Sequence, residues 1–246
     1  MSLKKKLLNK FLTSNYKVIE PDTFIKRLRS LTIGEGMLHD GNIYLIDYAL
    51  RNMPDDGIVL EIGSYGGLST NLITYLLKKH KRNTSMINCD PWIYEGYDDH
   101  QKETPDHHID GRDDITRVDY SAYMKAHFIN STKFLSSDNL PYSIESTSDD
   151  FFKSYHDKTH TKDLFGRSIQ LGSPISFAYI DGNHDYEFVK RDFHNIDKHI
   201  MPSGFILFDD SADELNFGSV KFMSDMKSNK KYRLVDKNPN YLFCKL

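Results

Sequence analysis

A short apolar run followed by a glycine-rich turn constrains the fold of this chain more than any other stretch. Residues 58–62 (Ile-Val-Leu-Glu-Ile) predict a buried parallel strand, and 68–77 resumes an apolar helical pattern. Between the two lie Gly63, Gly66 and Gly67. Because bare backbone at a helix start lets a ligand approach closely, this order of elements predicts a site for a nucleotide-like molecule. A tight turn without a ligand is the alternative.

The glycine spacing distinguishes two kinds of nucleotide ligand. A dinucleotide fingerprint requires glycine at 63, 65 and 68, and this chain has Tyr65 and Leu68 at two of these positions. An acidic residue two positions before Gly63, the Gly66-Gly67 pair and a Ser-Thr pair at the helix start instead resemble the first motif of class I S-adenosylmethionine-dependent methyltransferases. In that family the glycines admit the methionine part of the cofactor. The resemblance implies that the cofactor is bound by Glu61, Gly63, Ser64, Tyr65, Gly66 and Ser69.

A second predicted strand, 85–90, ends in an acidic residue, Asp90. Asp90 follows Gly63 by 27 residues, about the length of one strand-helix-strand unit. A carboxylate in this place can accept hydrogen bonds from the two ribose hydroxyls of an adenosine, so we interpret Asp90 as a ribose ligand. An Asp that only shapes the turn before Pro91 is the alternative.

Three more carboxylates follow two later strands. The predicted strand 175–180 is followed by Asp181, and the predicted strand 205–208, after a turn at 202–204, is followed by Asp209 and Asp210. In an open parallel sheet these strand ends meet at one edge. Three carboxylates in one place repel one another unless protons or a cation intervene, and oxygen ligands suit Mg²⁺, Mn²⁺ or Ca²⁺. A polar strand end facing the cofactor without a metal is the alternative.

The run 179–186 (Tyr-Ile-Asp-Gly-Asn-His-Asp-Tyr), with Phe-Asp-Asp at 208–210, resembles a methyltransferase subgroup that includes catechol O-methyltransferase and the macrolide-sugar O-methyltransferases. The resemblance implies that Asp181, which also lies beside the cofactor, Asp209 and Asp210 hold Mg²⁺. It also implies that His184 accepts the substrate proton. The sugar enzymes have histidine at this position and the catechol enzymes lysine, which favours a sugar hydroxyl as acceptor. Asp at 210 departs from the Asn of the catechol pattern and leaves metal use open.

The loop after a short predicted strand, 142–145, is a further candidate cofactor contact. In the methyltransferase family this loop lies near the adenine, which implies a contact from Ser146, with Thr147 beside it. A plain helix cap at Ser148 or Asp149 is the alternative.

The remaining segments predict one domain at 34–246 that follows an N-terminal helical extension at 1–33. Residues 91–118 lack periodicity and are rich in Asp and Glu, so they predict a lid insertion over the substrate. The other predicted elements are helices at 43–51, 119–128, 186–200 and 216–229, a helical or irregular passage at 151–170, and a final antiparallel hairpin of 232–236 and 241–245.

Composition and net charge limit the kinds of binding partner and the cellular setting that are expected. The chain of 246 residues is 39% hydrophobic and 27% charged, which is typical of a soluble domain with one sizeable core. A net charge of −3 gives no electrostatic reason to expect nucleic acid, and no apolar run reaches membrane-spanning length, so no membrane association is expected. Two cysteines without metal or redox spacing fit a reduced, cytoplasmic setting. The oligomeric state, a homodimer included, stays open.

The sequence therefore predicts a single α/β domain with a Rossmann-like methyltransferase fold, a seven-stranded mostly parallel sheet and a C-terminal antiparallel hairpin. The predicted function is methyl transfer from S-adenosylmethionine to a hydroxyl of a small molecule or sugar, assisted by Mg²⁺ or another divalent cation. The alternatives are a metal-independent methyltransferase, an NAD(P)-binding oxidoreductase, which the glycine spacing argues against, and a catalytically silent cofactor-binding protein.

Overall fold

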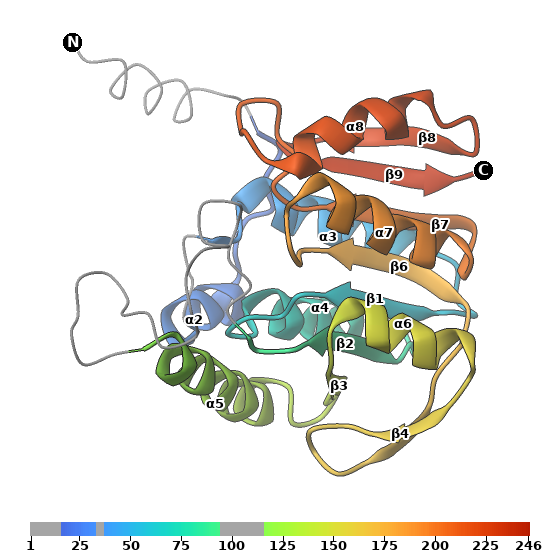
Figure 1. The fold of residues 1–246 in the computed structure, drawn as a ribbon. Coiled ribbons are helices and arrows are strands. Elements are labelled where there is room, and N and C mark those ends of the chain that lie inside the picture. Colours follow the sequence, from blue (N-terminus) through green and yellow to red (C-terminus); the bar gives the residue numbers. More distant parts are fainter. Residues whose placement is uncertain (1–15, 33–36, 94–115) are drawn as a thin grey trace.

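A seven-stranded sheet forms the centre of the computed structural model, which describes residues 16–32, 37–93 and 116–246 (Figure 1). The strand order is β3-β2-β1-β6-β7-β9-β8. The strands are β1 Ile58–Ile62, β2 Met86–Asp90, β3 Tyr142–Glu145, β6 Ile175–Ile180, β7 Ile200–Phe208, β8 Tyr232–Lys237 and β9 Tyr241–Lys245. The helices are α2 Thr23–Leu31, α3 Asp40–Asn52, α4 Leu68–Lys79, α5 Arg117–Leu135, α6 Ser148–His156, α7 Tyr186–Asp197 and α8 Gly218–Ser228.

The pairing confirms the predicted fold. Strands β3, β2, β1, β6 and β7 run parallel, whereas β9 runs antiparallel to both β7 and β8. In the register, Ile62 of β1 pairs with Ile180 of β6, which pairs with Phe208 of β7. The three strands thus end level with one another. The residues that follow them are therefore delivered to one edge of the sheet.

Apolar residues cover both faces of the sheet, as expected for parallel strands with helices on each side. One core packs α6, α7 and α8 against side chains such as Leu60 and Ile180. The other core packs α2, α3 and α4 against side chains such as Val59 and Phe177. Figure 1 shows α6, α7 and α8 in front of the sheet and α3 and α4 behind it. Alternate residues of one strand thus stabilise opposite layers.

Several predicted elements differ from the structure. Helix α7 ends at Asp197, and Ile200, the last position of the predicted helix 186–200, is the first residue of β7. Helix α5 continues to Leu135, beyond the predicted end at 128. The turn predicted at 202–204 is a bulge within β7, where the register with β6 shifts and Ser203 has a φ of 62°. The passage 151–170 comprises most of α6 and a two-stranded hairpin of β4 His160–Lys162 and β5 Ser168–Gln170, which pair only with each other.

The domain boundaries stay predictions. Most of the lid predicted at 91–118 and the start of the predicted N-terminal extension lie outside the described residues, as does the boundary near 33. Helix α2, at the end of that extension, packs Ile25 and Leu28 into the core that α4 shares. Across the three described ranges, none of the helices has both the length and the apolar character needed to cross a membrane.

Candidate active site

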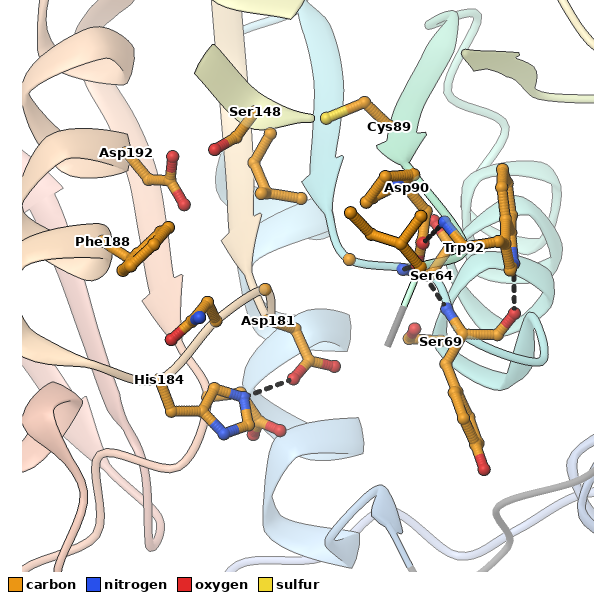
Figure 2. A pocket seen from close by; sticks show the side chains of 18 of the residues that line it. Ser64, Ser69, Cys89, Asp90, Trp92, Ser148, Asp181, His184, Phe188 and Asp192 are labelled. Carbon is orange, nitrogen blue, oxygen red and sulfur yellow. Dashed lines mark hydrogen bonds and ion pairs between the residues drawn. The ribbon is translucent and has the colours of Figure 1, made fainter. Parts of the chain in front are cut away.

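One cavity of about 710 Å³ lies at the carboxyl edge of the sheet. Its walls come from the turns after β1, β2, β6 and β7, from the start of α6, and from α5 and α7. Figure 2 shows Asp90 and Trp92 at one side of this cavity, Asp181 and His184 at another, and Asp192 above them. The cavity thus brings together the turns that the sequence singles out.

Gly63 is required where β1 and β6 end. Its φ is 84°, and a Cβ at this position would lie 1.9 Å from the carbonyl oxygen of Asp181. The N–H of Asp181 in turn donates to the carbonyl of Ile62 at 2.8 Å. Any larger residue has to push the two strand ends apart. The glycine therefore sets the floor of the cavity as well as lining it.

Asp90 fastens the glycine turn to the end of β2. Its Oδ2 accepts from the backbone N–H groups of Ser64 at 2.8 Å and Tyr65 at 2.9 Å. Its Oδ1 accepts from the N–H of Trp92 at 2.6 Å. Burial raises the pKa of Asp90 to about 6, although these backbone hydrogen bonds oppose the increase. Each carboxylate oxygen has two lone pairs, so Oδ1 can accept one more donor from the cavity.

Glu61 lies behind the turn. Its side chain is fully buried, and its Oε2 accepts from the hydroxyls of Ser64 and Thr70 and from the amide of Asn88. Among the described residues, the cavity walls include Ser64 and Ser69 but leave Glu61 out. Burial raises the pKa of Glu61 to about 7. Glu61 thus supports the glycine turn through Ser64 and Thr70, and its predicted contact with the cofactor stays a prediction.

An aromatic wall joins the glycine turn to α5. Trp92 donates from Nε1 to the carbonyl of Tyr65 at 2.9 Å, and the hydroxyls of Tyr65 and Tyr120 are hydrogen-bonded. Trp92 also packs against Phe128 with ring centroids 4.8 Å apart. Tyr65 and Trp92 both have a φ of 45°, a conformation that costs energy for a non-glycine residue. The hydrogen bonds that their N–H groups donate to Asp90, together with the packing against α5, hold Tyr65 and Trp92 in this conformation.

His184 lies between two carboxylates. Its Nδ1 is 2.9 Å from Oδ2 of Asp210, and its Nε2 is 3.5 Å from Oδ1 of Asp181. Phe217 presents its ring edge-on to the imidazole at 5.4 Å. Burial opposes protonation of His184, but the hydrogen bonds and charges of Asp181 and Asp210 outweigh it and raise the pKa to about 10. In this arrangement His184 is an imidazolium at neutral pH.

The side chain of Asp209 faces α3 and the hairpin of β8 and β9, behind the cavity. Its Oδ1 accepts from the amide of Asn42 in α3 and from the amide of Asn240, just before β9, the latter at 2.7 Å. Only 6% of Asp209 is exposed. Burial and the charges of Asp181 and Asp210 raise the pKa of Asp209 well above its usual range. Segments almost 200 positions apart in the chain thus fix one carboxylate of the site.

The carboxylates do not form a metal site as they stand. Across residues 16–32, 37–93 and 116–246, no group of three or more His, Cys, Asp or Glu side chains has the arrangement of a metal-ion site. His184 already occupies the space between Asp181 and Asp210, and two amides engage Oδ1 of Asp209. The divalent cation expected at these three aspartates stays a prediction.

Ser146 lies next to the cavity wall. Its N–H donates to the carbonyl of Asp90 at 3.2 Å and its hydroxyl to the carbonyl of Thr147 at 3.0 Å. In the described part of the chain, it is Thr147 to Asp149 that line the cavity from this loop. The helix cap is Thr147, whose hydroxyl accepts from the N–H of Asp150 at 3.3 Å.

Sequence reasoning missed the contribution of helix α7. Phe188, Arg191 and Asp192 line the cavity, although none was singled out beforehand. Asp192 is 2% exposed and precedes Phe193 in the apolar stripe of the helix. A charged residue within such a stripe is unusual and was the available signal. Trp92, Tyr120 and Phe217 gave no comparable signal, because the ring and hydroxyl contacts that place them in the wall are made with residues far away in the sequence, such as Phe128, Tyr65 and His184.

A mostly parallel sheet with a glycine turn and an acidic strand end at one cavity is the arrangement in which nucleotide-cofactor-binding α/β domains hold their ligands. The model of the methyltransferase domain family matches residues 60–211, which is more than half of the chain. The chain therefore belongs to the methyltransferase domain family.

Solved structures agree with this assignment at the level of the fold. S-adenosylhomocysteine-bound methyltransferase PaMTH1 from Podospora anserina superposes with a TM-score of 0.57 at 14% identity, covering 98% of this chain and 94% of that one. CalS11, described as a TDP-rhamnose 3′-O-methyltransferase of calicheamicin biosynthesis, gives 0.54 at 15%, covering 100% and 95%. The O-methyltransferase NovP gives 0.52 at 14%, covering 83% and 78%. A search of curated proteins finds no significant match.

Proposed function

We propose that this protein transfers a methyl group from S-adenosylmethionine to a hydroxyl oxygen of a small molecule, with sugars as the first class to test. The observation that carries the proposal is one cavity shared by the Gly63 turn, Asp90 and the His184 cluster. Family membership supports methyl transfer. Similar folds that are named as O-methyltransferases, one of them acting on a nucleotide-linked sugar, support oxygen as the acceptor atom.

We assign the cofactor to the side of the cavity formed by the turn after β1 and the end of β2. The free lone pair on Oδ1 of Asp90 suits a ribose hydroxyl. Gly63, Ser64, Tyr65, Gly66 and Ser69 line the same side, and the absence of a Cβ at Gly63 leaves room for the methionine part. Carboxylates around the cavity favour a positively charged cofactor.

We assign the acceptor to the side where His184, Asp210 and Phe217 meet. When bound, the cofactor supplies a methyl carbon that is already electrophilic on a sulfonium, which leaves as a neutral thioether. The residues of this side then have to align the hydroxyl oxygen with that carbon and accept the hydroxyl proton. Alignment alone can contribute several kcal/mol, within the ~7–11 kcal/mol known for well-oriented reactants.

We assign the proton acceptor to His184, which is 11% exposed and hydrogen-bonded through Nδ1 to Asp210. A base has to be neutral before it accepts a proton, and a pKa of about 10 leaves few molecules with neutral His184 at pH 7. In the arrangement described here, we therefore expect kcat to increase with pH up to about 10. A bound divalent cation would offset the charge of Asp181 and Asp210 and lower that pKa.

Cofactor binding is the first test. S-adenosylhomocysteine at ~100 times its Kd should add ~2.7 kcal/mol to the free energy of unfolding, a melting shift of roughly 5–10 °C. NAD and NADP should give no shift. Asp90→Ala should weaken S-adenosylhomocysteine roughly 10- to 150-fold in calorimetry, because charge-assisted hydrogen bonds to the ribose are lost. Asp138→Ala, which removes an exposed carboxylate paired with Lys78, is the matched control.

The outcomes separate the alternatives. A shift with NAD and none with S-adenosylhomocysteine contradicts the proposal and favours an oxidoreductase. Unchanged affinity in Asp90→Ala leaves Asp90 as a turn residue. Binding of S-adenosylhomocysteine, with no labelled methyl transferred to any of a broad range of hydroxyl compounds, favours a catalytically silent protein.

A further inference from the structure

The start of helix α8 packs closely against the loop that carries His184. A Cβ on Gly218 would lie 1.9 Å from the backbone nitrogen of Tyr186, so a larger residue would push the two segments apart. Phe217, one position earlier, presents its ring to the imidazole of His184 at 5.4 Å. Ser219, one position later, is 1% exposed. This helix start is therefore part of the surroundings of the proposed proton acceptor.

Ser219 makes two hydrogen bonds that join the loop of His184 to the turn of Asp210. Its backbone N–H donates to the carbonyl of His184 at 3.0 Å, and its hydroxyl donates to the carbonyl of Asp210 at 2.5 Å. The backbone N–H groups in the first turn of a helix have no partner within the helix, so this one can serve another segment. One residue of α8 thus holds the segment after β6 and the segment after β7 together.

The turn at Asp210 has a conformation that needs such support. Its φ is 47°, which costs energy for a residue other than glycine. The hydrogen bond from the hydroxyl of Ser219 holds the carbonyl of Asp210 and so stabilises the backbone from which the carboxylate projects. Oδ2 of that carboxylate lies 2.9 Å from Nδ1 of His184. A rotation of this turn would therefore lengthen the contact between the carboxylate and the imidazole.

We propose that Ser219 is a positioning residue for methyl transfer, because it keeps Asp210 within hydrogen-bond distance of His184. This inference rests on the proposed function, in which His184 accepts the hydroxyl proton. Among the described residues, the cavity walls include His184 and Asp210 but not Ser219, so Ser219 acts through these two side chains. A displacement of about 1 Å in such a site can lower the rate roughly 100-fold.

Ser219→Ala tests the proposal, since it removes the hydroxyl and keeps the backbone N–H. Transfer of labelled methyl from S-adenosylmethionine to the range of hydroxyl compounds should be roughly 10- to 100-fold slower. The affinity for S-adenosylhomocysteine in calorimetry should not change. Ser219→Cys, which keeps a side chain of similar shape but replaces the hydroxyl by a weak donor, should give the same result and serves if Ser219→Ala does not fold.

Tyr155→Phe is the matched control for stability. The hydroxyl of Tyr155 donates to the carbonyl of Ser173 at 2.5 Å, the same distance as in the bond from Ser219. Ser173 precedes β6, at the edge of the sheet opposite to the cavity. Tyr155→Phe should therefore lower the melting temperature, as Ser219→Ala does, and leave the rate of methyl transfer unchanged.

A spectroscopic measurement tests the position of His184 without any acceptor. In the S-adenosylhomocysteine complex, the imidazole N–H that faces Asp210 should give a downfield, slowly exchanging proton resonance, because it is bonded to a carboxylate. Its absence in His184→Gln assigns it. The resonance should be lost or exchange faster in Ser219→Ala and stay unchanged in Tyr155→Phe.

A double variant tests whether Ser219 acts through Asp210. If it does, adding Ser219→Ala to Asp210→Asn should slow methyl transfer little further, because the contact that Ser219 supports is already altered. Independent effects would multiply instead.

Three results overturn the inference without touching the proposed function: an unchanged imidazole resonance in Ser219→Ala and in Ser219→Cys, an equal loss of rate in Tyr155→Phe, or independent effects in the double variant. Failure of S-adenosylhomocysteine to bind, or no methyl transfer by the unmodified protein, contradicts the proposed function instead.

Discussion

At the scale of single residues, one side chain of this site can fix the backbone around the cavity and also line the cavity itself. Asp90 is the main example, since one carboxylate accepts from the backbone of Ser64, Tyr65 and Trp92. Two of those three residues have a positive φ and line the cavity. The conformation that shapes the cavity is therefore maintained by the same carboxylate that we propose as the ribose ligand, and loss of Asp90 should affect both the cavity wall and cofactor binding.

Glu61 gives a prediction about pH. Its pKa is raised from 4.5 to about 7, so the folded state binds a proton that the unfolded state releases. Its contribution to stability is complete below pH 4.5 and is lost as the pH increases through about 7. Between pH 4.5 and 8, the free energy of unfolding should therefore decline by about 3 kcal/mol less in Glu61→Gln than in the unmodified protein.

Urea unfolding at several pH values measures this. Glu145→Gln, in which an exposed glutamate paired with Lys125 is replaced, is the matched control and should follow the unmodified protein. An identical pH dependence in Glu61→Gln and the unmodified protein would mean that Glu61 is charged throughout this range.

At the scale of elements, the site depends on how closely β1 and β6 approach. A Cβ on Gly63 would lie 1.9 Å from the carbonyl oxygen of Asp181, and the register holds the two strand ends level. Packed strands yield little, so a methyl group here has to displace Asp181 and with it the loop that carries His184. A change at the glycine turn should therefore also move the acidic cluster, which consists of Asp181, Asp209 and Asp210.

Gly63→Ala should consequently lose both stability and methyl transfer. Gly166→Ala is the matched control, because Gly166 has a φ of 79° but no heavy atom of the described chain within 4 Å of an added Cβ. Both variants lose the left-handed freedom of glycine, about 1–2 kcal/mol. Only Gly63→Ala adds the steric cost, about 2 kcal/mol more in unfolding experiments. Equal destabilisation of the two variants would refute the close approach.

At the scale of the whole molecule, the acidic cluster is assembled from distant parts. Asp181 follows β6, Asp209 and Asp210 follow β7, and Asn42 and Asn240 reach Asp209 from α3 and the C-terminal hairpin. The insertion of β9 between β7 and β8 brings Asn240 to the site. Only the complete sheet forms this arrangement.

The predicted divalent cation is tested on this assembled cluster. If it is required, a chelator should abolish methyl transfer and leave S-adenosylhomocysteine binding intact, and Mg²⁺ or Mn²⁺ should restore the activity. Asp181→Ala and Asp209→Ala should then behave like chelated enzyme, whereas His184→Gln should lower kcat by roughly 10²- to 10⁴-fold without releasing the metal. Full activity in chelator would contradict metal assistance and leave the three aspartates as structural or substrate-binding groups.

The sequence by itself determined the class of fold and the strand ends that form the site. Buried apolar runs, the glycine turn and the acids after three strands are local features, so they could be recognised without a structure. The strand 142–145 was predicted with the bounds that the structure has. The bulge in β7 and the separate β4–β5 hairpin were not predicted, because pairing partners decide them and not local pattern.

Only the tertiary structure decided what each polar residue contacts. Glu61 and Asp90 are both acidic and both close to the glycine turn, yet burial beneath Ser64 and Thr70 makes one a support and leaves the other in the cavity wall. His184, Asp181 and Asp210 were recognisable as a group, but their distances and the raised pKa of the imidazole depend on β6 and β7 ending level. The pairing of Arg191 with Asp149 joins two helices far apart in the chain, and a long-range contact of this kind leaves no local pattern in the sequence.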